Sequence, residues 1–262
     1  FFAPYSRKLW GIDPARLSAD WAPQRIGSFD LSQALAGLFG LSRARPRTVA
    51  RRFLYPRLGM GQLFDAIALE IRARGGSILL GTRVEGLALE GGRVRALRTA
   101  SGELEARSFV STLPLAELAG FLRVETRLRF RGVRFANVML DAPARLGSTW
   151  AYLSDGAGLV SRVQEPARRS PFMVPPGRGS LQLEIPCSPG DEVWALADAD
   201  LFARAWPEVA RAGLEIPAAV TGSFSFRARC AYPVFERSTR EEIARAQAAA
   251  AGADNLELAG RQ

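Results

Sequence analysis

The sequence predicts a mixed α/β fold, in which helices are interleaved with short strands that form mainly antiparallel sheets. Hydrophobic residues make up 48% of the 262 residues, which is enough for a substantial core. Helical and strand-like hydrophobic periodicities follow one another along the chain. Clusters of proline or glycine separate the strand candidates, as expected for the loops of such sheets.

The N-terminal segment, residues 1–51, is expected to form helical pieces with turns between them. The stretch GIDPARLSADWA offers Asp13 as an N-cap and Pro14 as the first helical residue. Aromatic residues are dense in this segment. Such a cluster forms core more often than it forms a ligand pocket.

The sequence of residues 52–115 predicts a helix that leads into a β-meander. The stretch GQLFDAIALEIRARGG has apolar residues at helical spacing and ends at Gly75-Gly76, which indicates a helix of about four turns. Four strands are expected after it, at 77–80, 84–90, 93–99 and 106–111. Gly91-Gly92 separates two of these strands, where a two-residue hairpin turn requires positive φ.

Residues 116–235 predict an antiparallel sheet with flanking helices. The strand candidates are VRFANVML, TWAYLS, SLQLEIPC and VTGSFSFRARCAYPV, and GDEVWALADADLFARAWPEVARAGL supplies the helices.

The last segment, residues 236–262, predicts a helix followed by a short strand. Ser238 and Glu241 have the spacing of a capping box, an alanine-rich run follows, and Gly252 is expected to stop the helix. The strand after it should pair in one sheet with residues 77–80.

Composition excludes several classes of chemistry. The chain has no histidine, which rules out Ser-His-Asp and Cys-His nucleophile systems. Because there are only two cysteines, Cys187 and Cys230, no metal site is expected, and both are expected to be reduced thiols. No signal peptide and no apolar run of membrane-spanning length is found, so we expect a cytoplasmic protein.

The positive charge of the chain raises the question of an anionic partner. The formal net charge is +9 and comes almost entirely from arginine. The densest basic run, LSRARPRTVARRF, is interrupted by proline and apolar residues, so a solvated face explains the charge better than nucleic-acid binding. We expect no nucleic-acid partner. A peripheral contact with anionic lipid or a phosphorylated ligand stays open, as does the oligomeric state.

Seven stretches of sequence occur in an order that points to a known family. They are FFAPYSRKLWGIDPARLSADWAPQRI, YPRLGMGQL, LEIRARGGSILLGTRVEGLALEGGRVRALR, VSTLPL, LEIPCSPGDEVW, AYPVFE and NLELAGR. In this order they resemble the middle and late part of flavin-dependent amine oxidoreductases, the group that includes protoporphyrinogen oxidase and, more distantly, UDP-galactopyranose mutase.

The resemblance implies a discontinuous FAD-binding domain, of which this chain carries part. Residues 52–115 would be the middle part of that domain and residues 236–262 the start of its C-terminal return. Residues 116–235 would form a substrate domain with the helical segment 1–51 beside it. The glycine-rich turn that binds the pyrophosphate in this family is not found, since Phe64 stands where Gly59-Met60-Gly61 would need a third glycine. The resemblance thus implies an internal fragment that is inactive by itself.

The family pattern also implies which residues contact the cofactor and the substrate. Glycine permits close backbone approach and arginine pairs with phosphate oxygens, so the end of the chain would border the diphosphate. The cofactor candidates are Val84, Ser111, Thr112, Pro114, Gly260 and Arg261. The substrate candidates are Tyr5, Arg25 and Trp150. No catalytic base is assigned.

The function implied by the resemblance is hydride transfer from a small-molecule substrate to FAD. A flavin-dependent sugar-nucleotide mutase resembling UDP-galactopyranose mutase is the first alternative. A non-enzymatic basic module that binds anionic partners is the second.

Overall fold

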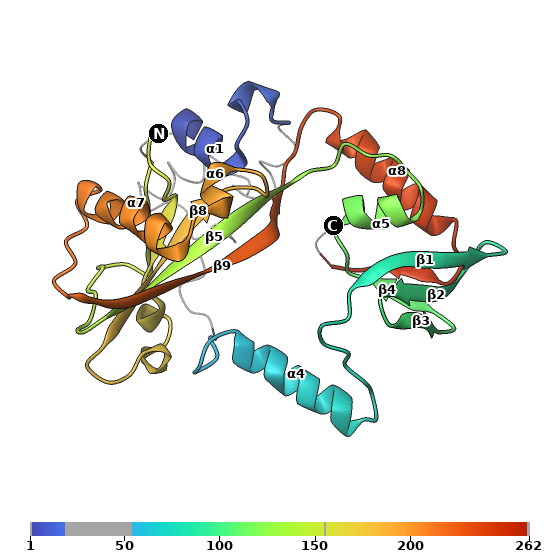
Figure 1. Ribbon diagram of the computed structural model, residues 1–262, viewed down its shortest axis with the longest axis horizontal. Helices are drawn as coiled ribbons and strands as arrows, with labels where there is room; N and C mark the ends of the chain where they lie inside the picture. Colours follow the sequence, from blue (N-terminus) through green and yellow to red (C-terminus); the bar gives the residue numbers. More distant parts are fainter. Residues whose placement is uncertain (1, 19–53, 155, 261–262) are drawn as a thin grey trace, which may run out of the picture.

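The computed structural model describes residues 2–18, 54–154 and 156–260. Figure 1 shows two regions that are joined by two long strands, β5 (Phe130–Leu140) and β9 (Val220–Pro233). We name them the large-sheet region, built on a five-stranded sheet, and the small-sheet region, built on a three-stranded and a two-stranded sheet. The predicted mixed α/β architecture with antiparallel sheets is confirmed.

The five-stranded sheet has the strand order β6-β7-β8-β5-β9, and all its neighbours are antiparallel. Its three remaining strands are β6 (Trp150–Tyr152), β7 (Arg162–Gln164) and β8 (Gly179–Pro186). Four of the five strands were predicted. Strand β7 was not predicted, because three residues between irregular loops carry too little alternation to be recognised.

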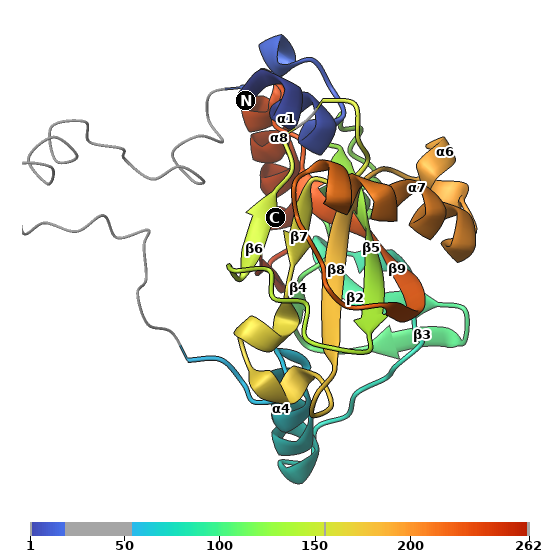
Figure 2. The same cartoon turned by 90° about the vertical axis from the view of Figure 1, so that its left-hand side faces the viewer.

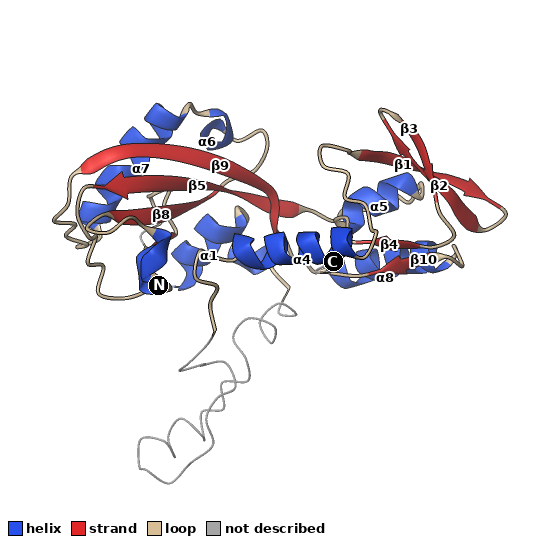
Figure 3. Cartoon of the chain, turned by 90° about the horizontal axis from the view of Figure 1, so that it is seen from below, coloured by secondary structure: helices blue, strands red, loops and turns tan. Residues whose placement is uncertain are grey.

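Two helices cover one face of this sheet, α6 (Glu192–Ala195) and α7 (Asp198–Arg211). Figure 3 shows both helices on one side of the sheet and α1 (Phe2–Trp10) on the other. Acidic residues in the first turn of α7 and Arg211 in its last turn suit the helix dipole. The buried face of α7 packs on alternate strand residues, which form the largest core cluster of the described chain.

The three-stranded sheet is a meander of β1 (Val84–Glu90), β2 (Arg93–Thr99) and β3 (Gly102–Glu105). The strands at 84–90 and 93–99 and the turn between them were predicted and are confirmed. Gly91 and Gly92 have φ of 55° and 73°, as a tight hairpin requires. The strand β3 was not predicted.

The helix predicted before the meander is confirmed as α4 (Gly61–Ala73), but the strand predicted at 77–80 is absent. Leu79 and Leu80 are 58% and 82% exposed, and no described strand lies beside them. A run of apolar residues forms a strand only where a second backbone completes its hydrogen bonds, and here none does.

The strand expected at 255–259 is β10 (Leu256–Leu258), which pairs in parallel with β4 (Phe109–Ser111). The expected pairing of this strand with residues 77–80 is therefore wrong. Two helices, α5 (Leu115–Phe121) and α8 (Thr239–Ala251), contact each other and cover this small sheet. Figure 1 shows them beside β4 and the meander.

The side chain of Asn255 ties this small sheet to the meander. Its Oδ1 accepts from the Val94 amide at 2.9 Å, and its Nδ2 donates to the carbonyls of Val94 at 2.8 Å and Arg107 at 3.0 Å. The amide side chain thus replaces a peptide group between β2 and the approach to β4. Asn255 is buried, so these bonds are shielded from water.

Two predicted caps have different outcomes. Asp13 precedes a short 3₁₀ helix, Pro14–Arg16, and its Oδ1 accepts from the Ala15 amide at 2.9 Å, so the predicted cap is confirmed. The predicted capping box at α8 is wrong, because Ser238 has helical φ and ψ and its side chain makes no capping bond. The hydroxyl of Thr239 accepts instead from the Glu236 amide at 2.8 Å.

Both cysteines are free thiols, Cys187 buried and Cys230 exposed, in agreement with the expectation. Two further 3₁₀ turns, Pro166–Arg168 and Pro171–Met173, lie in the loop between β7 and β8. Across the described residues, no helix combines the length and apolar character needed to cross a bilayer.

Candidate cofactor and substrate sites

The cofactor candidates gather at the carboxyl ends of two parallel strands. Leu258 at the end of β10 pairs with Ser111 at the end of β4, and the amide of Ala259 donates to the Ser111 carbonyl at 3.0 Å. Loops that leave parallel strands at this end are where ligands bind in open α/β sheets. This edge forms because β4 and β10 are each only three residues long and the chain turns away from the sheet after them.

A small cavity of about 200 Å³ opens beside this edge. Val84, Ser111 and Thr112 line it, together with apolar side chains of the meander and of β10. Gly260 adjoins the cavity, since a Cβ added to it would lie 3.8 Å from the Thr112 Cβ. Its φ of 95° lies in the region that favours glycine.

The remaining cofactor candidates lie elsewhere. Pro114 does not line the cavity but precedes α5, where its carbonyl accepts from the Glu117 amide at 2.9 Å. Arg261 lies outside the described residues. The structure therefore brings together Val84, Ser111, Thr112 and Gly260.

These residues fit one end of a dinucleotide cofactor. The cavity is mainly apolar, with hydroxyls of Ser111 and Thr112 at its edge, which suits a flat ring with polar substituents. A site for a whole ligand of drug size occupies roughly 300 Å³ or more, so this cavity would hold only part of FAD. Gly260 leaves the backbone accessible where the ligand would continue.

The large sheet presents its second face away from α6 and α7. The register aligns two rows of side chains across all five strands on this face. The first row is Trp150, Gln164, Gln182, Asn137 and Phe224, and the second is Tyr152, Arg162, Glu184, Phe135 and Phe226. Each row has aromatic rings at its ends and polar groups at its centre, an arrangement suited to a flat or ring-containing ligand.

Hydrogen bonds link the polar groups of the first row. Gln182 Nε2 donates to Asn137 Oδ1 at 2.9 Å, and Gln164 Nε2 lies 3.4 Å from Gln182 Oε1. In the second row Arg162 binds both carboxylate oxygens of Glu184, with 2.8 Å from Nε to Oε2. Burial alone would lower the pKa of Arg162, but the hydrogen bond and charge of Glu184 raise it above its usual value. Arg162 therefore stays protonated.

Two of the three substrate candidates lie at this face. The ring of Tyr5, from α1, packs edge-on against Tyr152 with centroids 5.8 Å apart. Burial and the neighbouring Tyr152 raise the pKa of Tyr5 from 10.0 to about 12. Trp150 is 41% exposed and lies 5.7 Å from the guanidinium of Arg169. Arg25 lies outside the described residues.

A groove of about 620 Å³ continues from the first row toward the start of β8. Asn137, Gln182, Met139 and Phe224 form its floor on the sheet, and the loop with the two 3₁₀ turns forms its wall. Figure 2 shows this loop beside the start of α4. Two contacts fasten it there. The Ser170 hydroxyl donates to the Arg57 carbonyl at 2.6 Å, and Met173 packs near Gly59.

The amide residues Asn137, Gln164 and Gln182 were not predicted as site residues. A signal was present, because in LQLEIP polar residues alternate with apolar ones, and in FANVML the single polar residue, Asn137, lies among apolar ones. Such alternation indicates two different faces of a strand. It does not show that polar groups from separate strands lie in one row.

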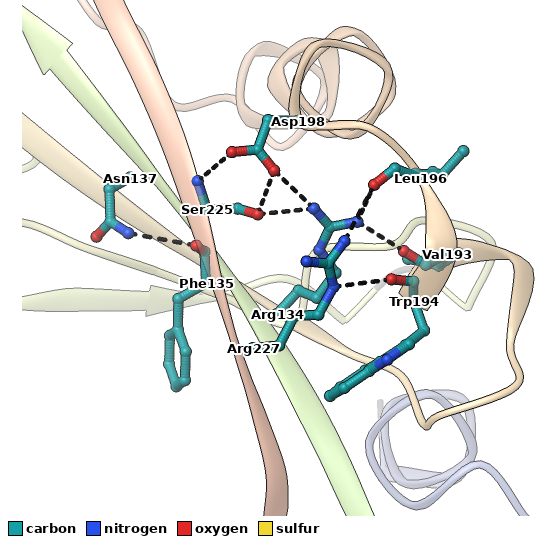
Figure 4. A network of polar contacts seen from close by, with 9 residues as sticks. All are labelled: Arg134, Phe135, Asn137, Val193, Trp194, Leu196, Asp198, Ser225 and Arg227. Atoms are coloured by element: carbon teal, nitrogen blue, oxygen red, sulfur yellow. Dashed lines mark hydrogen bonds and ion pairs between the residues drawn. The ribbon is translucent and has the colours of Figure 1, made fainter. Parts of the chain in front are cut away.

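A buried arginine on the opposite face holds the helices to the sheet, as Figure 4 shows. Arg134 donates to the carbonyls of Val193 at 3.1 Å and Leu196 at 2.7 Å. It also donates to Asp198 Oδ1 at 2.8 Å and Ser225 Oγ at 2.7 Å. Bonds from the Ser225 hydroxyl and amide lower the pKa of Asp198. This network fixes the start of α7 against the sheet that carries the rows.

Solved structures share this architecture. Reduced UDP-galactopyranose mutase superposes with a TM-score of 0.76 at 15% identity, covering 98% of this chain and 58% of that chain. A protein from Exiguobacterium sp. 255-15 assigned as a protoporphyrinogen oxidase has a TM-score of 0.68 at 18% identity, covering 91% and 54%. Putrescine oxidase with bound putrescine has a TM-score of 0.54 at 14% identity, covering 77% and 46%. At such identities the likeness shows the fold, and this chain spans little more than half of the first two structures.

No curated protein sequence matches this chain. The sequence does match the family model of flavin containing amine oxidoreductases, and it does so across residues 1–261. This family consists of FAD-dependent oxidoreductases. With the match extending over nearly the whole sequence, the chain belongs to the flavin-containing amine oxidoreductase family.

Proposed function

We propose that this chain supplies the substrate-facing sheet and part of the cofactor site of an enzyme that transfers a hydride from a small molecule to FAD. The observation that carries the proposal is the meeting of Val84, Ser111, Thr112 and Gly260 at the carboxyl ends of β4 and β10. When bound, FAD supplies the hydride acceptor.

In this proposal the residues of the chain bind and orient rather than carry protons. The backbone at Val84 and Gly260 lies where a ligand could approach closely, and the hydroxyl of Thr112 offers a hydrogen bond. The rows of the large sheet would orient the substrate. The candidate substrate residues Tyr5 and Trp150 lie at the rim of those rows. We expect the protein to act in the cytoplasm.

A test of the cofactor residues is saturation-transfer NMR with FAD, a method that detects weak binding. The chain lacks nearly half the length of the structures it resembles, so we expect weak affinity, with the adenine protons receiving the strongest transfer. Gly260→Ala should reduce this transfer, because its φ of 95° strains any residue other than glycine.

The matched control is Gly213→Ala, which also places alanine at positive φ, here 74°, but after α7 and far from β4 in sequence. Equal loss in both variants would indicate general destabilisation and would remove the support for Gly260. Absence of any transfer to FAD from the unaltered chain would contradict the cofactor assignment.

The second candidate function is a flavin-dependent sugar-nucleotide mutase. The observation that favours it is charge: Arg178 is the one ionisable residue among the described groove-lining residues, and a sugar nucleotide carries negative phosphates. A protein that carries this chain would distinguish the two functions. Isomerisation of UDP-galactopyranose by the reduced enzyme supports the mutase, and bleaching of the flavin by a substrate without isomerisation supports the oxidoreductase.

A further inference from the structure

The charges around the groove are strongly unbalanced. Along residues 162–184 there are four arginines and two glutamates, and each glutamate is already paired. Glu184 binds Arg162, and Glu165 binds Arg168 at 3.0 Å while also accepting from the Leu146 amide at 2.8 Å. The remaining cations, Arg169 and Arg178, have no carboxylate partner among the described residues.

Arg169 is fixed in position beside the first row. Its Nη2 donates to Gln164 Oε1 at 2.6 Å, and its guanidinium lies 6.0 Å from the Tyr55 ring and 5.7 Å from the Trp150 ring. Aromatic rings on this scale of distance hold a guanidinium in place without neutralising it. Most of its N–H donors therefore remain available to a ligand.

Arg178 lies at the other side of the groove, next to the start of β8. Its single side-chain hydrogen bond among the described residues runs from Nη1 to the Asp141 carbonyl, and at 3.5 Å this bond is long and weak. The groove floor beside Arg178 is neutral, with the amides of Asn137 and Gln182 and the apolar side chains of Met139 and Phe224.

From this arrangement we propose that the groove binds a substrate with an apolar or aromatic body and an acidic group, a carboxylate or a phosphate, which pairs with Arg178 or Arg169. The proposal rests on the proposed function and names its substrate class. Among the described residues an ammonium group would meet guanidinium groups of like charge and no unpaired carboxylate of the groove lining, so amines are disfavoured despite the name of the family.

The test compares three fluorescent probes that share one aromatic body: 2-naphthoate, 2-naphthyl phosphate and 2-naphthylmethylammonium. Binding is measured by fluorescence anisotropy of each probe with the full chain in the absence of FAD. We expect the carboxylate or the phosphate probe, or both, to bind more tightly than the ammonium probe. The two acidic probes distinguish the two sources of negative charge.

Charge-neutralising variants then locate the contact. Because these guanidinium groups are partly exposed, Arg178→Gln and Arg169→Gln should each weaken the preferred acidic probe about 3- to 10-fold. Arg211→Gln removes the same charge from an exposed position on α7, across the sheet, and should change affinity by less than about twofold.

An ammonium probe that binds as tightly as the acidic probes would overturn the proposal. An equal loss of affinity in the Arg211→Gln variant would do the same. Failure of all three probes to bind would also overturn it. These results are independent of FAD, so a failure of the cofactor assignment in the NMR experiment leaves the substrate class standing, and the reverse also holds.

Discussion

The large-sheet region and the small-sheet region bury their apolar side chains in different ways. In the large-sheet region α7 and the sheet enclose one extensive cluster that includes Val138, Leu183 and Leu201. The small-sheet region has two smaller clusters around α5 and α8. The large-sheet region is thus stabilised by a single core, whereas the small-sheet region depends more on individual hydrogen bonds, such as those of Asn255.

Two helices of similar length make the contrast concrete. Helix α7 has 14 residues and buries four of them, while α4 has 13 residues and buries none. In α4 the apolar residues Phe64, Ile67 and Leu69 are between 47% and 66% exposed. Exposed apolar faces of this kind are typical of surfaces that another element covers. A helical period therefore shows that a face exists, and not what packs against it.

The largest effect is expected from the core under α7. Leu201 is fully buried, so Leu201→Ala should lower the free energy of unfolding by about 2 to 5 kcal/mol through lost burial and the cavity left behind. Urea denaturation followed by circular dichroism measures the change. A loss under 1 kcal/mol would mean that this core is not the main source of stability.

A smaller effect is expected when the hydrogen bonds of the Asn255 side chain are removed. Asn255→Ala leaves the Val94 amide and the carbonyls of Val94 and Arg107 without this partner, at a cost of about 1 to 3 kcal/mol. Hydrogen exchange should show faster exchange of the Val94 amide. Asn255→Asp keeps the acceptor for that amide and loses the donors, so protection of Val94 should be partly retained. Unchanged exchange in the alanine variant would argue against these hydrogen bonds.

A pH titration of Tyr5 tests the packing on the face of the large sheet that carries the two rows. The raised pKa of Tyr5, about 12 against 10.0, means that the folded chain holds this proton more tightly than the unfolded chain. Its contribution to stability is complete below pH 10 and is lost as the pH rises toward 12. The tyrosinate absorbance of the unaltered chain should include a transition at higher pH than that of an exposed tyrosine. The Tyr5→Phe variant should lack this transition. A difference spectrum centred at the ordinary value would remove Tyr5 from the packed rim.

The smallest effect is expected on α4. Ile67→Ala should change the free energy of unfolding by no more than about 0.5 kcal/mol, because the side chain is already largely in water and alanine favours helix. The same denaturation experiment as for Leu201→Ala gives the comparison. A cost comparable to that of Leu201→Ala would show that the face of α4 is covered in solution, for example by a second copy of the chain.

The sequence by itself determined the local elements that depend on neighbouring residues. Helical spacing and terminal glycines gave α4, and the pair Gly91-Gly92 placed the hairpin between β1 and β2, because positive φ is a local property. The order of motifs also identified the family, which the family match confirms. The candidate residues around the cofactor came from that resemblance.

Only the tertiary structure decided which backbones pair and which side chains meet. Residues 77–80 looked like a strand but have no partner among the described strands, while β3 and β7 form because neighbouring strands complete their hydrogen bonds. The row from Gln164 through Gln182 to Asn137 depends on the register of three strands, and Arg169 joins it from a loop. Pairing is set by packing between distant segments, and a local pattern of alternation shows which residues share a face without showing which strand lies beside them.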